Sequence, residues 1–364
     1  MAGKNGTGEK IMKVLFVNPF GIGDVLFTTP LLRALKERGH SLYYLCNERV
    51  QGIIRYNDTL SGIYPLSRGD IKEIFRRSPY QAMKRLFEIA KTIGRERFDI
   101  ALDFSLDYRY SLFLRILGVK RIVGFDYKGR GRFLSDKITI PGFNDKHMVE
   151  YYAMLLDYVD KEARLGDKME LFIGGQDREW ARAYLEGKGL SMTDTLIGIA
   201  PGGGASWGKD SSIKHWPKEK FLYVAEELTS DYGYKVILLG DKKEIDICDF
   251  IEYRLKKNVI NACGKISIEQ FAAVLEKTQL LIANDGGPLH VAHALGVKTV
   301  SIFGPVDEKV YGPYRPGKRH VVKTSDIECR PCYRNFKYSK CDNRVCLESI
   351  KPDEVVESVR NILE

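Results

Sequence analysis

Two hydrophobic patterns alternate along most of this chain. Short apolar runs, such as Lys13–Asn18 and Phe98–Asp103, predict buried strands, whereas Val25–Arg38 and Pro79–Ile93 carry apolar residues at helical spacing. The same alternation resumes with Leu196–Ala200. Alternating strands and helices are typical of a doubly wound, mostly parallel sheet, so the pattern predicts an α/β fold.

Three segments of the first half need a more specific interpretation. Pro30 either kinks the segment Val25–Arg38 or lies in the first turn of a helix that opens near Thr28. The polar, glycine-rich stretch Asp126–Pro141 predicts a mobile loop. The run His147–Tyr158 predicts one long helix that ends this half.

The chain of 364 residues is long for one hydrophobic core. We predict two domains, residues 1–174 and 175–364, with a hinge near Gly174-Gly175 and a cysteine-rich insertion at 329–346 in the second. Ligands of open α/β folds bind at the carboxyl ends of the strands. The expected ligand site is therefore a cleft between the carboxyl ends of two sheets.

Glycine-rich turns follow three predicted strands of the second half, at Pro201–Gly204, Gly240-Asp241 and Asp285–Pro288. The turn at Asp285 leads into a helical run that contains His290, so free backbone N–H groups and the positive end of a helix dipole predict an anion site. The alternative is a plain turn in which Asp285 only caps the helix. The three turns are expected to converge at one sheet edge, which favours a nucleotide site.

Two further motifs can supply chemistry. Lys214, in Lys214-His-Trp-Pro217, stands just before a helix and can neutralise charge on a leaving diphosphate, although a surface lysine beside a core Trp216 is the alternative. In Gly21-Ile-Gly-Asp24, Asp24 is either a helix N-cap or a general base. Leu26 stands where the dinucleotide fingerprint needs its third glycine.

Composition narrows the class of partner. The chain has 57 Lys and Arg against 48 Asp and Glu, a net charge of +9, which favours an acidic ligand or surface. Basic side chains of the first half that are expected to face acceptor or lipid phosphates are Arg76, Arg77, Lys84, Arg130 and Arg132. No apolar run approaches the roughly 20 residues of a membrane span, and the polar first ten residues do not resemble a signal peptide. A cytoplasmic protein is expected.

Four of the seven cysteines cluster near the C-terminus: Cys329, Cys332, Cys341 and Cys346. A C-x-x-C pair with two further thiols can hold a structural zinc ion. An iron–sulfur cluster and disulfides are the alternatives, although the expected compartment argues against disulfides. The remaining cysteines, Cys46, Cys248 and Cys263, are expected to be small core residues.

The segments Lys13–Asp24, Pro201–Pro217 and Asn284–Gly296 resemble the signatures of glycosyltransferase family 9, the ADP-heptose:lipopolysaccharide heptosyltransferases. The resemblance runs from about Lys13 to the C-terminus. It implies the GT-B fold, in which two Rossmann-like doubly wound domains face each other across a cleft. It also implies that the N-terminal domain binds the acceptor and the C-terminal domain binds the nucleotide-sugar.

The resemblance also implies roles for particular residues. Asp24 would be the catalytic base, with Gly23, Arg130 and Arg132 on the acceptor side. Lys214 would contact the diphosphate and assist catalysis. The remaining residues of the implied nucleotide-sugar site are Gly202, Gly203, Asp241, Asp285, Gly286, Gly287 and His290. Gly286 stands where Ser or Thr is common, and the turn Gly240–Glu244 departs from the usual acidic pattern, which leaves the ribose or adenine contact open.

The expected activity is therefore inverting transfer of a heptose or related sugar from an ADP-sugar to a lipopolysaccharide core or similar glycan. No cofactor is expected for transfer, since no Asp-x-Asp pair stands at the strand ends. The expected partners are ADP-heptose, an anionic glycolipid and the inner face of the inner membrane, but not nucleic acid. A GT-B transferase of another nucleotide-sugar, and a binding protein without catalysis, remain alternatives.

Overall fold

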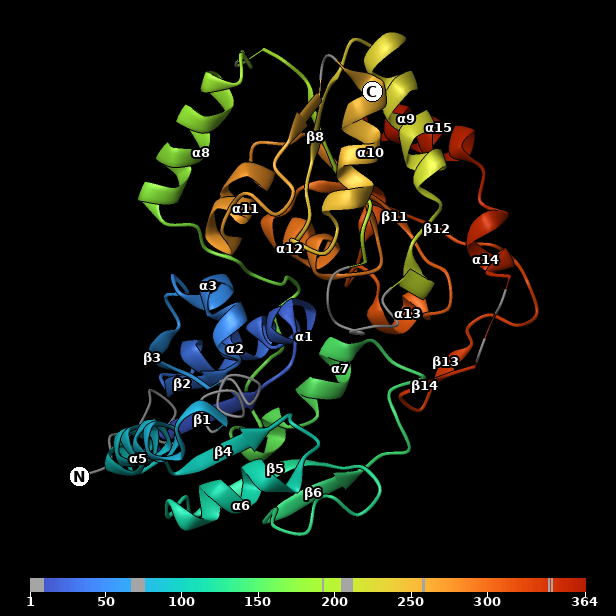
Figure 1. The fold of residues 1–364 in the computed structure, drawn as a ribbon. Helices are drawn as coiled ribbons and strands as arrows, with labels where there is room; N and C mark the ends of the chain where they lie inside the picture. Colours follow the sequence, from blue (N-terminus) through green and yellow to red (C-terminus); the bar gives the residue numbers. More distant parts are fainter. Residues whose placement is uncertain are drawn as a thin grey trace. The chain divides into compact units, whose positions relative to one another are not determined.

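The structure is a computed structural model that describes residues 10–66, 76–191, 193–203, 212–256, 259–339, 341 and 343–364. Contacts between Cα atoms divide the chain into two compact units (Figure 1). The first contains Met1–Phe143 and Met148–Met169, and the second contains Asn144–His147 and Glu170–Glu364. The short segment Asn144–His147 therefore packs with residues that lie far from it in the sequence.

The first unit is built on one parallel sheet. Its strands are β1 (Lys13–Asn18), β2 (Ser41–Cys46), β3 (Leu60–Pro65), β4 (Ile100–Asp103), β5 (Arg121–Asp126) and β6 (Asp136–Thr139). Their order is β3-β2-β1-β4-β5-β6, the doubly wound order. The helical segments are α1 (Ile22–Phe27), α2 (Thr29–Glu37), η1 (Glu48–Val50), α3 (Gln51–Ile54), α5 (Pro79–Glu96), α6 (Tyr108–Ile116), α7 (Met148–Ala153) and η2 (Leu156–Tyr158).

Side chains of β1 alternate between two cores. Leu15 and Val17 face the cluster that includes residues of α5 and α6. Phe16 instead stacks with Tyr44 and Phe104. Phe104 in turn contacts the ring of Tyr152 from α7. Because successive side chains of a strand point to opposite faces, helices cover both faces of the sheet.

The second unit repeats this design. Its strands are β7 (Leu196–Ala200), β8 (Lys235–Leu238), β9 (Val259–Asn261), β10 (Leu280–Asn284), β11 (Lys298–Ile302), β12 (His320–Lys323) and the short antiparallel pair β13 (Tyr333–Arg334) and β14 (Lys337–Tyr338). In the order β12-β11-β10-β7-β8-β9, later strands lie on both sides of the central pair β7 and β10. The first sheet has the same arrangement around β1 and β4. Both units are thus Rossmann-like, which confirms the predicted α/β class.

Helices again lie on both sides of the second sheet (Figure 1). They are α8 (Gly175–Gly187), α9 (Lys218–Ser230), α10 (Ile245–Leu255), α11 (Ile268–Leu275), α12 (Gly287–Leu295), α13 (Glu308–Tyr311), η4 (Gly317–Arg319), α14 (Val345–Glu348) and α15 (Pro352–Leu363). The core on one face joins β-strand residues to α9, α10, α14 and α15. Cys46, Cys248 and Cys263 are buried core residues, as expected.

The structure corrects two of the sequence-based elements. The stretch that predicted a mobile loop contains β6, an edge strand whose alternating exposure weakens its hydrophobic signal. The predicted long helix His147–Tyr158 is two short pieces, α7 and η2. Pro30 lies in the first turn of α2, where its missing N–H costs no hydrogen bond. Within the described residues, no helix combines the length and hydropathy that crossing a membrane requires.

Candidate functional site

The three glycine-rich turns of the second unit follow neighbouring strands. The sheet places β10, β7 and β8 side by side and parallel, so the turns after them meet at the carboxyl edge, as predicted. The strand order reverses between β7 and β10, which is the topological switch point where ligands of such folds bind. Gly202 and Gly203 follow β7 there, and Asp285 follows β10. Gly204, the last residue of the predicted first turn, lies outside the described residues.

A buried ion pair lies at this switch point. The Nζ atom of Lys214 is 2.6 Å from Oδ2 of Asp285, and each side chain is only 6% exposed. The alternative of a surface lysine is therefore wrong, although Trp216 does pack in the core. Asp285 does not cap α12 either, because the N-cap residue is Gly286. The pair holds the ammonium group beside the start of a helix, whose backbone N–H groups are also hydrogen-bond donors.

Asn284, which was not among the predicted site residues, joins the parts of this site. Its side-chain amide donates to the carbonyl oxygen of Pro201 at 2.7 Å, and its Oδ1 accepts from the backbone N–H of Trp216 at 3.1 Å. One buried side chain thus links the end of β10, the turn after β7 and the segment that carries Lys214. A polar residue at the end of the apolar run Leu280–Ala283 is the sequence signal that marks this position.

The start of α12 packs tightly on the turn after β7. A Cβ atom at Gly286 would lie 2.6 Å from the carbonyl oxygen of Gly203, so no side chain fits here without a shift. This contact is the reason that the backbone, as it stands here, needs glycine at position 286. Pro288 lies in the first turn of the helix, and Gly287 is its first residue. The helix start therefore approaches the neighbouring turn through backbone alone.

His290 is a neutral side chain in the first half of α12. Burial lowers the pKa of its imidazole well below the usual value, and the nearby His147, His293 and Lys214 lower it further. At neutral pH this residue can donate or accept a hydrogen bond but brings no charge. Among the described residues of this site, Lys214 carries a positive charge that is paired with Asp285, and a helix N-terminus and a neutral imidazole lie beside it.

The turn after β8 is arranged around a carboxylate. Glu244 is buried, and its Oε2 accepts from the backbone N–H of Asp241 at 2.8 Å. A Cβ atom at Gly202 would collide with the Glu244 carboxylate. The side chain of Asp241 is exposed and accepts from the N–H of Lys243, within its own turn. The sequence singled out Asp241, whereas the structure brings Glu244 to the glycines.

Asp24 lies at the equivalent switch point of the first sheet, after β1. It is half-buried in the first turn of α1, where the N-cap is Gly21, so the N-cap alternative is wrong. The hydroxyl of Tyr152 donates to its Oδ1 at 3.2 Å, and Asn18 donates to its backbone carbonyl oxygen. Gly23 precedes it in the same turn. The Tyr152 contact spans 128 residues of sequence, so no local motif could reveal it.

A second carboxyl group ends the neighbouring strand β4. Burial raises the pKa of Asp103 to about 6, although hydrogen bonding from Ser105 opposes the rise. Asp103 was not among the predicted site residues, although it is a polar residue at the end of a buried strand. Asp103 and Asn284 occupy equivalent strand ends in the two units.

Arg130 and Arg132 lie in the turn after β5, two strands from β1. Both side chains are exposed. The Arg132 guanidinium lies 4.0 Å from the centre of the Tyr108 ring, and that of Arg130 lies 5.7 Å from the Tyr127 ring. Asp126 holds the turn by accepting from the N–H of Gly131. The two arginines are therefore presented on a structured turn.

The four clustered cysteines are near one another but differ in exposure. Cys329 and Cys341 are exposed, Cys332 is half-buried and Cys346 is buried. Burial raises the pKa of the Cys332 and Cys346 thiols, and the neighbouring cysteines raise it further. In the part of the chain that the structure describes, no three His, Cys, Asp or Glu side chains are arranged to hold a metal ion. Zinc at this cluster stays a prediction.

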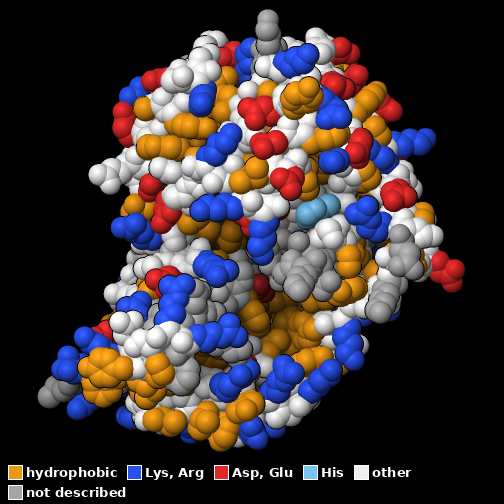
Figure 2. Space-filling view, in the orientation of Figure 1, with side chains coloured by type: hydrophobic (Ala, Val, Ile, Leu, Met, Phe, Trp, Pro, Cys, Tyr) orange, Lys and Arg blue, Asp and Glu red, His pale blue; other side chains and the backbone are white. Residues whose placement is uncertain are grey.

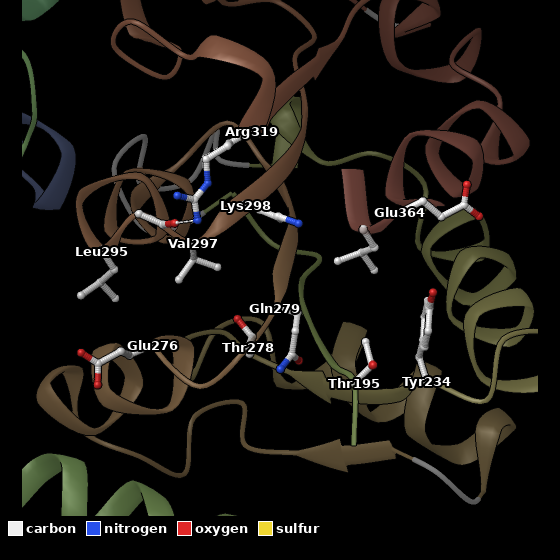
Figure 3. A pocket seen from close by; sticks show the side chains of 12 residues that line it. Thr195, Tyr234, Glu276, Thr278, Gln279, Leu295, Val297, Lys298, Arg319 and Glu364 are labelled. Carbon is white, nitrogen blue, oxygen red and sulfur yellow. Dashed lines mark hydrogen bonds between the residues drawn. The ribbon is translucent and has the colours of Figure 1, made fainter. Parts of the chain in front are cut away.

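A hollow of about 480 Å³ lies at the opposite edge of the second sheet, where its strands begin (Figure 3). Thr195 precedes β7, Gln279 precedes β10 and Lys298 begins β11. Two cationic side chains there are held by backbone carbonyls, Arg319 by that of Gly296 and Lys298 by that of Ile362. This hollow is separate from the switch point and contains none of the predicted site residues.

Comparison with known proteins connects this geometry to a family. Residues 86–341 match the model of glycosyltransferase family 9 (heptosyltransferase). The chain is 25% identical to lipooligosaccharide heptosyltransferase 2 of Campylobacter jejuni, over 97% of this chain and 99% of that protein. It is 26% identical to lipopolysaccharide heptosyltransferase 1 of Pseudomonas aeruginosa, over 89% of this chain and 86% of that protein.

Solved structures show the same fold. A glycosyltransferase of family 9 from Veillonella parvula matches with a TM-score of 0.79 and 23% identity, over 97% of both chains. The Escherichia coli heptosyltransferase WaaC with ADP matches with a TM-score of 0.72 and 18% identity, over 96% of this chain and 100% of that one. With two Rossmann-like units and the matched family model covering most of its length, the chain belongs to glycosyltransferase family 9.

Proposed function

We propose that this protein transfers a heptose from ADP-heptose to an anionic glycan of the lipopolysaccharide core type. The buried Lys214–Asp285 pair beside the start of α12 is the observation that carries the proposal, because it holds an ammonium group in place next to the backbone N–H groups of a helix N-terminus. The names of the relatives support the sugar and the acceptor. Solved relatives contain ADP and an ADP-2-deoxy-2-fluoro heptose, which supports the nucleotide.

The proposed donor site combines a charge with backbone donors. Lys214 and the N–H groups at the start of α12, around Gly286 and Gly287, would bind the diphosphate. Neutral His290 would donate one hydrogen bond and add no charge. Gly202 and Gly203 are the proposed backbone contacts of the donor in the turn after β7, where the Glu244 carboxylate fills the side-chain space at Gly202. Asp241 is the proposed contact at the turn after β8. Negative charge that develops on the leaving diphosphate is then stabilised by groups already in position.

The proposed reaction is a single displacement with inversion. The acceptor hydroxyl oxygen forms a bond to the anomeric carbon as the bond from that carbon to the diphosphate oxygen breaks. Asp24 takes the hydroxyl proton, and ADP leaves with the bonding electron pair. The hydroxyl group of Tyr152 orients the Asp24 carboxylate. Gly23, Arg130 and Arg132 are the proposed acceptor contacts, the arginines for its phosphate groups.

The proposal requires no metal ion for transfer, since the Lys214 ammonium group and the N–H groups of the helix start supply hydrogen-bond donors for the diphosphate. It places the enzyme in the cytoplasm, working at the inner face of the inner membrane, where a lipid-linked acceptor would be found. A structural zinc ion at Cys329, Cys332, Cys341 and Cys346 is a separate proposal. Metal analysis of the purified protein by mass spectrometry tests it, and protein that contains no zinc contradicts it.

Calorimetric titration with ADP-heptose, UDP-glucose and GDP-mannose tests the donor. We expect binding of the ADP-sugar alone, and a preference for UDP- or GDP-sugars would replace heptose transfer by the alternative of another GT-B donor. Proton NMR of the product tests the stereochemistry, since inversion changes the anomeric coupling. Binding of ADP-heptose without turnover on any glycan acceptor would favour the alternative of a non-catalytic binding protein.

A further inference from the structure

The outer side of α5 carries large apolar side chains that are mostly exposed. Tyr80 is 77% exposed, Met83 59% and Phe87 67%. They are spaced three and four residues apart, so they form one stripe along the helix. The inner side of the same helix packs on the sheet through Leu86, Ile89 and Ile93. The exposed stripe is thus additional to the face that folding buries.

Helix α6 lies on the same side of the first sheet as α5. Both helices contribute to the same core cluster, so they cover one face of the first sheet. They meet near Gly94, where a Cβ atom would be 4.0 Å from the carbonyl oxygen of Leu117. On α6, Ile116 is 74% exposed. Four of the seven exposed large apolar side chains found in the described residues therefore lie on these two adjacent helices. Scattered exposed apolar residues are ordinary, but such a concentration marks an interaction surface.

Basic side chains border the stripe. Lys84 lies four residues after Tyr80, and Lys91 lies four residues after Phe87, so each lysine is next to the stripe on the helix surface. Arg95 follows Lys91 by another four residues. All three are exposed. Helix α5 contains two acidic residues, Glu88 and Glu96, and the negative charge of Glu96 is paired with Lys13. Figure 2 shows apolar side chains with Lys and Arg around them at the position of α5 in Figure 1.

This combination fits one kind of partner. A helix with aromatic and apolar residues on one side and Lys or Arg beside them lies in the plane of a membrane interface. Tyr and Phe occupy the headgroup boundary, while the basic groups contact anionic phosphates. A second copy of this chain fits less well, because a symmetric contact would bring the two basic borders together. Positive charge and apolar area thus favour an anionic lipid surface.

We propose that the outer face of α5 and α6, defined by Tyr80, Met83, Phe87 and Ile116 with Lys84, Lys91 and Arg95, docks the enzyme on an anionic membrane. The inference rests on the proposed function, because a transferase with a lipid-linked acceptor must work at a membrane surface. It adds which face of the first unit meets the lipid. The docked helix lies parallel to the membrane and does not cross it.

Sedimentation with vesicles tests the docking face in the full-length protein. We expect binding to vesicles of equal parts phosphatidylethanolamine and phosphatidylglycerol, weakening as salt is added, and little binding to pure phosphatidylcholine. The triple variant Tyr80→Ser, Met83→Ser, Phe87→Ser should bind the anionic vesicles at least about tenfold more weakly. Tyr253→Ser is the matched control, because Tyr253 is also 77% exposed but lies on α10 of the second unit.

The basic border is tested by a charge reversal. Lys91→Glu should weaken binding to the anionic vesicles by more than about fivefold, because each basic residue near such a surface contributes about a factor of five and the new carboxylate is also repelled. Lys351→Glu makes the same change in net charge at an exposed position of the second unit and should leave vesicle binding unchanged. Equal effects of Lys91→Glu and Lys351→Glu would overturn the assignment of this face, as would unchanged binding by the triple variant.

Two measurements separate this inference from the proposed function. Transfer to a soluble, lipid-free acceptor should be the same in the triple variant and the parent protein. Normal vesicle binding without any heptose transfer would refute the proposed function and retain the docking face. Heptose transfer without vesicle binding would refute the docking face and retain the proposed function. The face would instead bind a second copy of the chain if three results came together. The parent protein would form dimers in light scattering, the triple variant would be monomeric, and the parent protein would not bind vesicles.

Discussion

The switch points of the two sheets have the same position in the fold but opposite character. In the second unit, the strand ends carry a buried ion pair, Lys214–Asp285, and Asn284 with hydrogen bonds to two other segments. In the first unit, Asp24 is half-buried and receives a hydrogen bond from Tyr152. A site for a fixed diphosphate gains from groups held rigidly in place, whereas a base must remain accessible to a hydroxyl group. The difference thus fits the two proposed roles, a donor site in the second unit and a base in the first.

The largest expected effect separates chemistry from stability at the first switch point. Asp24→Asn should lower kcat about 10²–10⁴-fold, because a general base contributes that much to rate. The half-buried position predicts little loss of folding free energy, and titration with ADP should give an unchanged Kd. Tyr152→Phe is the matched control and should lower kcat less, since the carboxylate remains. Full activity of Asp24→Asn would remove this residue from the base role.

The second switch point should respond in the opposite way. Lys214→Met leaves the buried Asp285 carboxylate without its cation, which should lower the free energy of unfolding by about 3–5 kcal/mol. Urea denaturation measures this loss. Lys235→Met, at the start of β8, serves as a lysine control outside the ion pair. The double variant Lys214→Met, Asp285→Leu should recover most of the stability but not ADP binding. Unchanged ADP affinity in it would contradict a diphosphate contact.

A smaller effect is expected at Asn284, which tests whether the second site is held in place by one side chain. Asn284→Ala removes bonds to Pro201 and Trp216, so the free energy of unfolding should fall by about 1–3 kcal/mol. Misplacement of Lys214 should also raise the Kd for ADP. Asn284→Asp keeps the acceptor oxygen for the Trp216 N–H but loses the donor. An unaltered Kd in both variants would show that the turns keep their positions without this link.

The smallest expected effect concerns pH, and its direction should differ between the units. Burial lowers the pKa of His293 to about 4. As pH falls below about 6.5, this histidine therefore binds a proton in the unfolded chain before it does so in the folded chain. The free energy of unfolding should drop by about 1–3 kcal/mol as a result. Burial raises the pKa of Asp103 to about 6, so this carboxylate binds a proton in the folded chain before it does so in the unfolded chain. Its contribution to the free energy of unfolding therefore rises as pH falls from 6 towards 4.

Thermal unfolding between pH 7 and pH 4 compares these contributions. His293→Gln should reduce the loss of stability on acidification, and Asp103→Asn should make that loss larger. Parallel pH profiles for the parent and both variants would contradict the opposite titration of these two groups.

Much of the second site was predictable because its motifs are local. Glycines after buried strands mark turns, and parallel strands bring such turns to one edge, so Gly202, Asp241, Asp285 and their neighbours could be grouped from sequence alone. Lys214 and Asp24 were selected from their own motifs, and the resemblance to family 9 implied their roles. Roles implied in this way remain to be tested by the variants above, since the fold by itself does not establish them.

Other features could not be predicted, because they depend on residues distant in sequence. Tyr152 reaches Asp24 across 128 positions, and Asn284 reaches Trp216 across 68. The carboxylate of Glu244 fills the space beside Gly202, although the exposed Asp241 looked like the better candidate. Edge strand β6 was missed because half of its residues face solvent.

The sequence by itself determined the α/β class, the two repeats of strand and helix, and the turns that carry glycine, because hydrophobic periodicity and backbone freedom are local properties. Tertiary structure alone decided that Lys214 is buried against Asp285, that His290 is neutral, and that apolar residues of α5 remain outside the core. Burial and charge pairing depend on which segments meet, and that information lies in the packing of the whole chain.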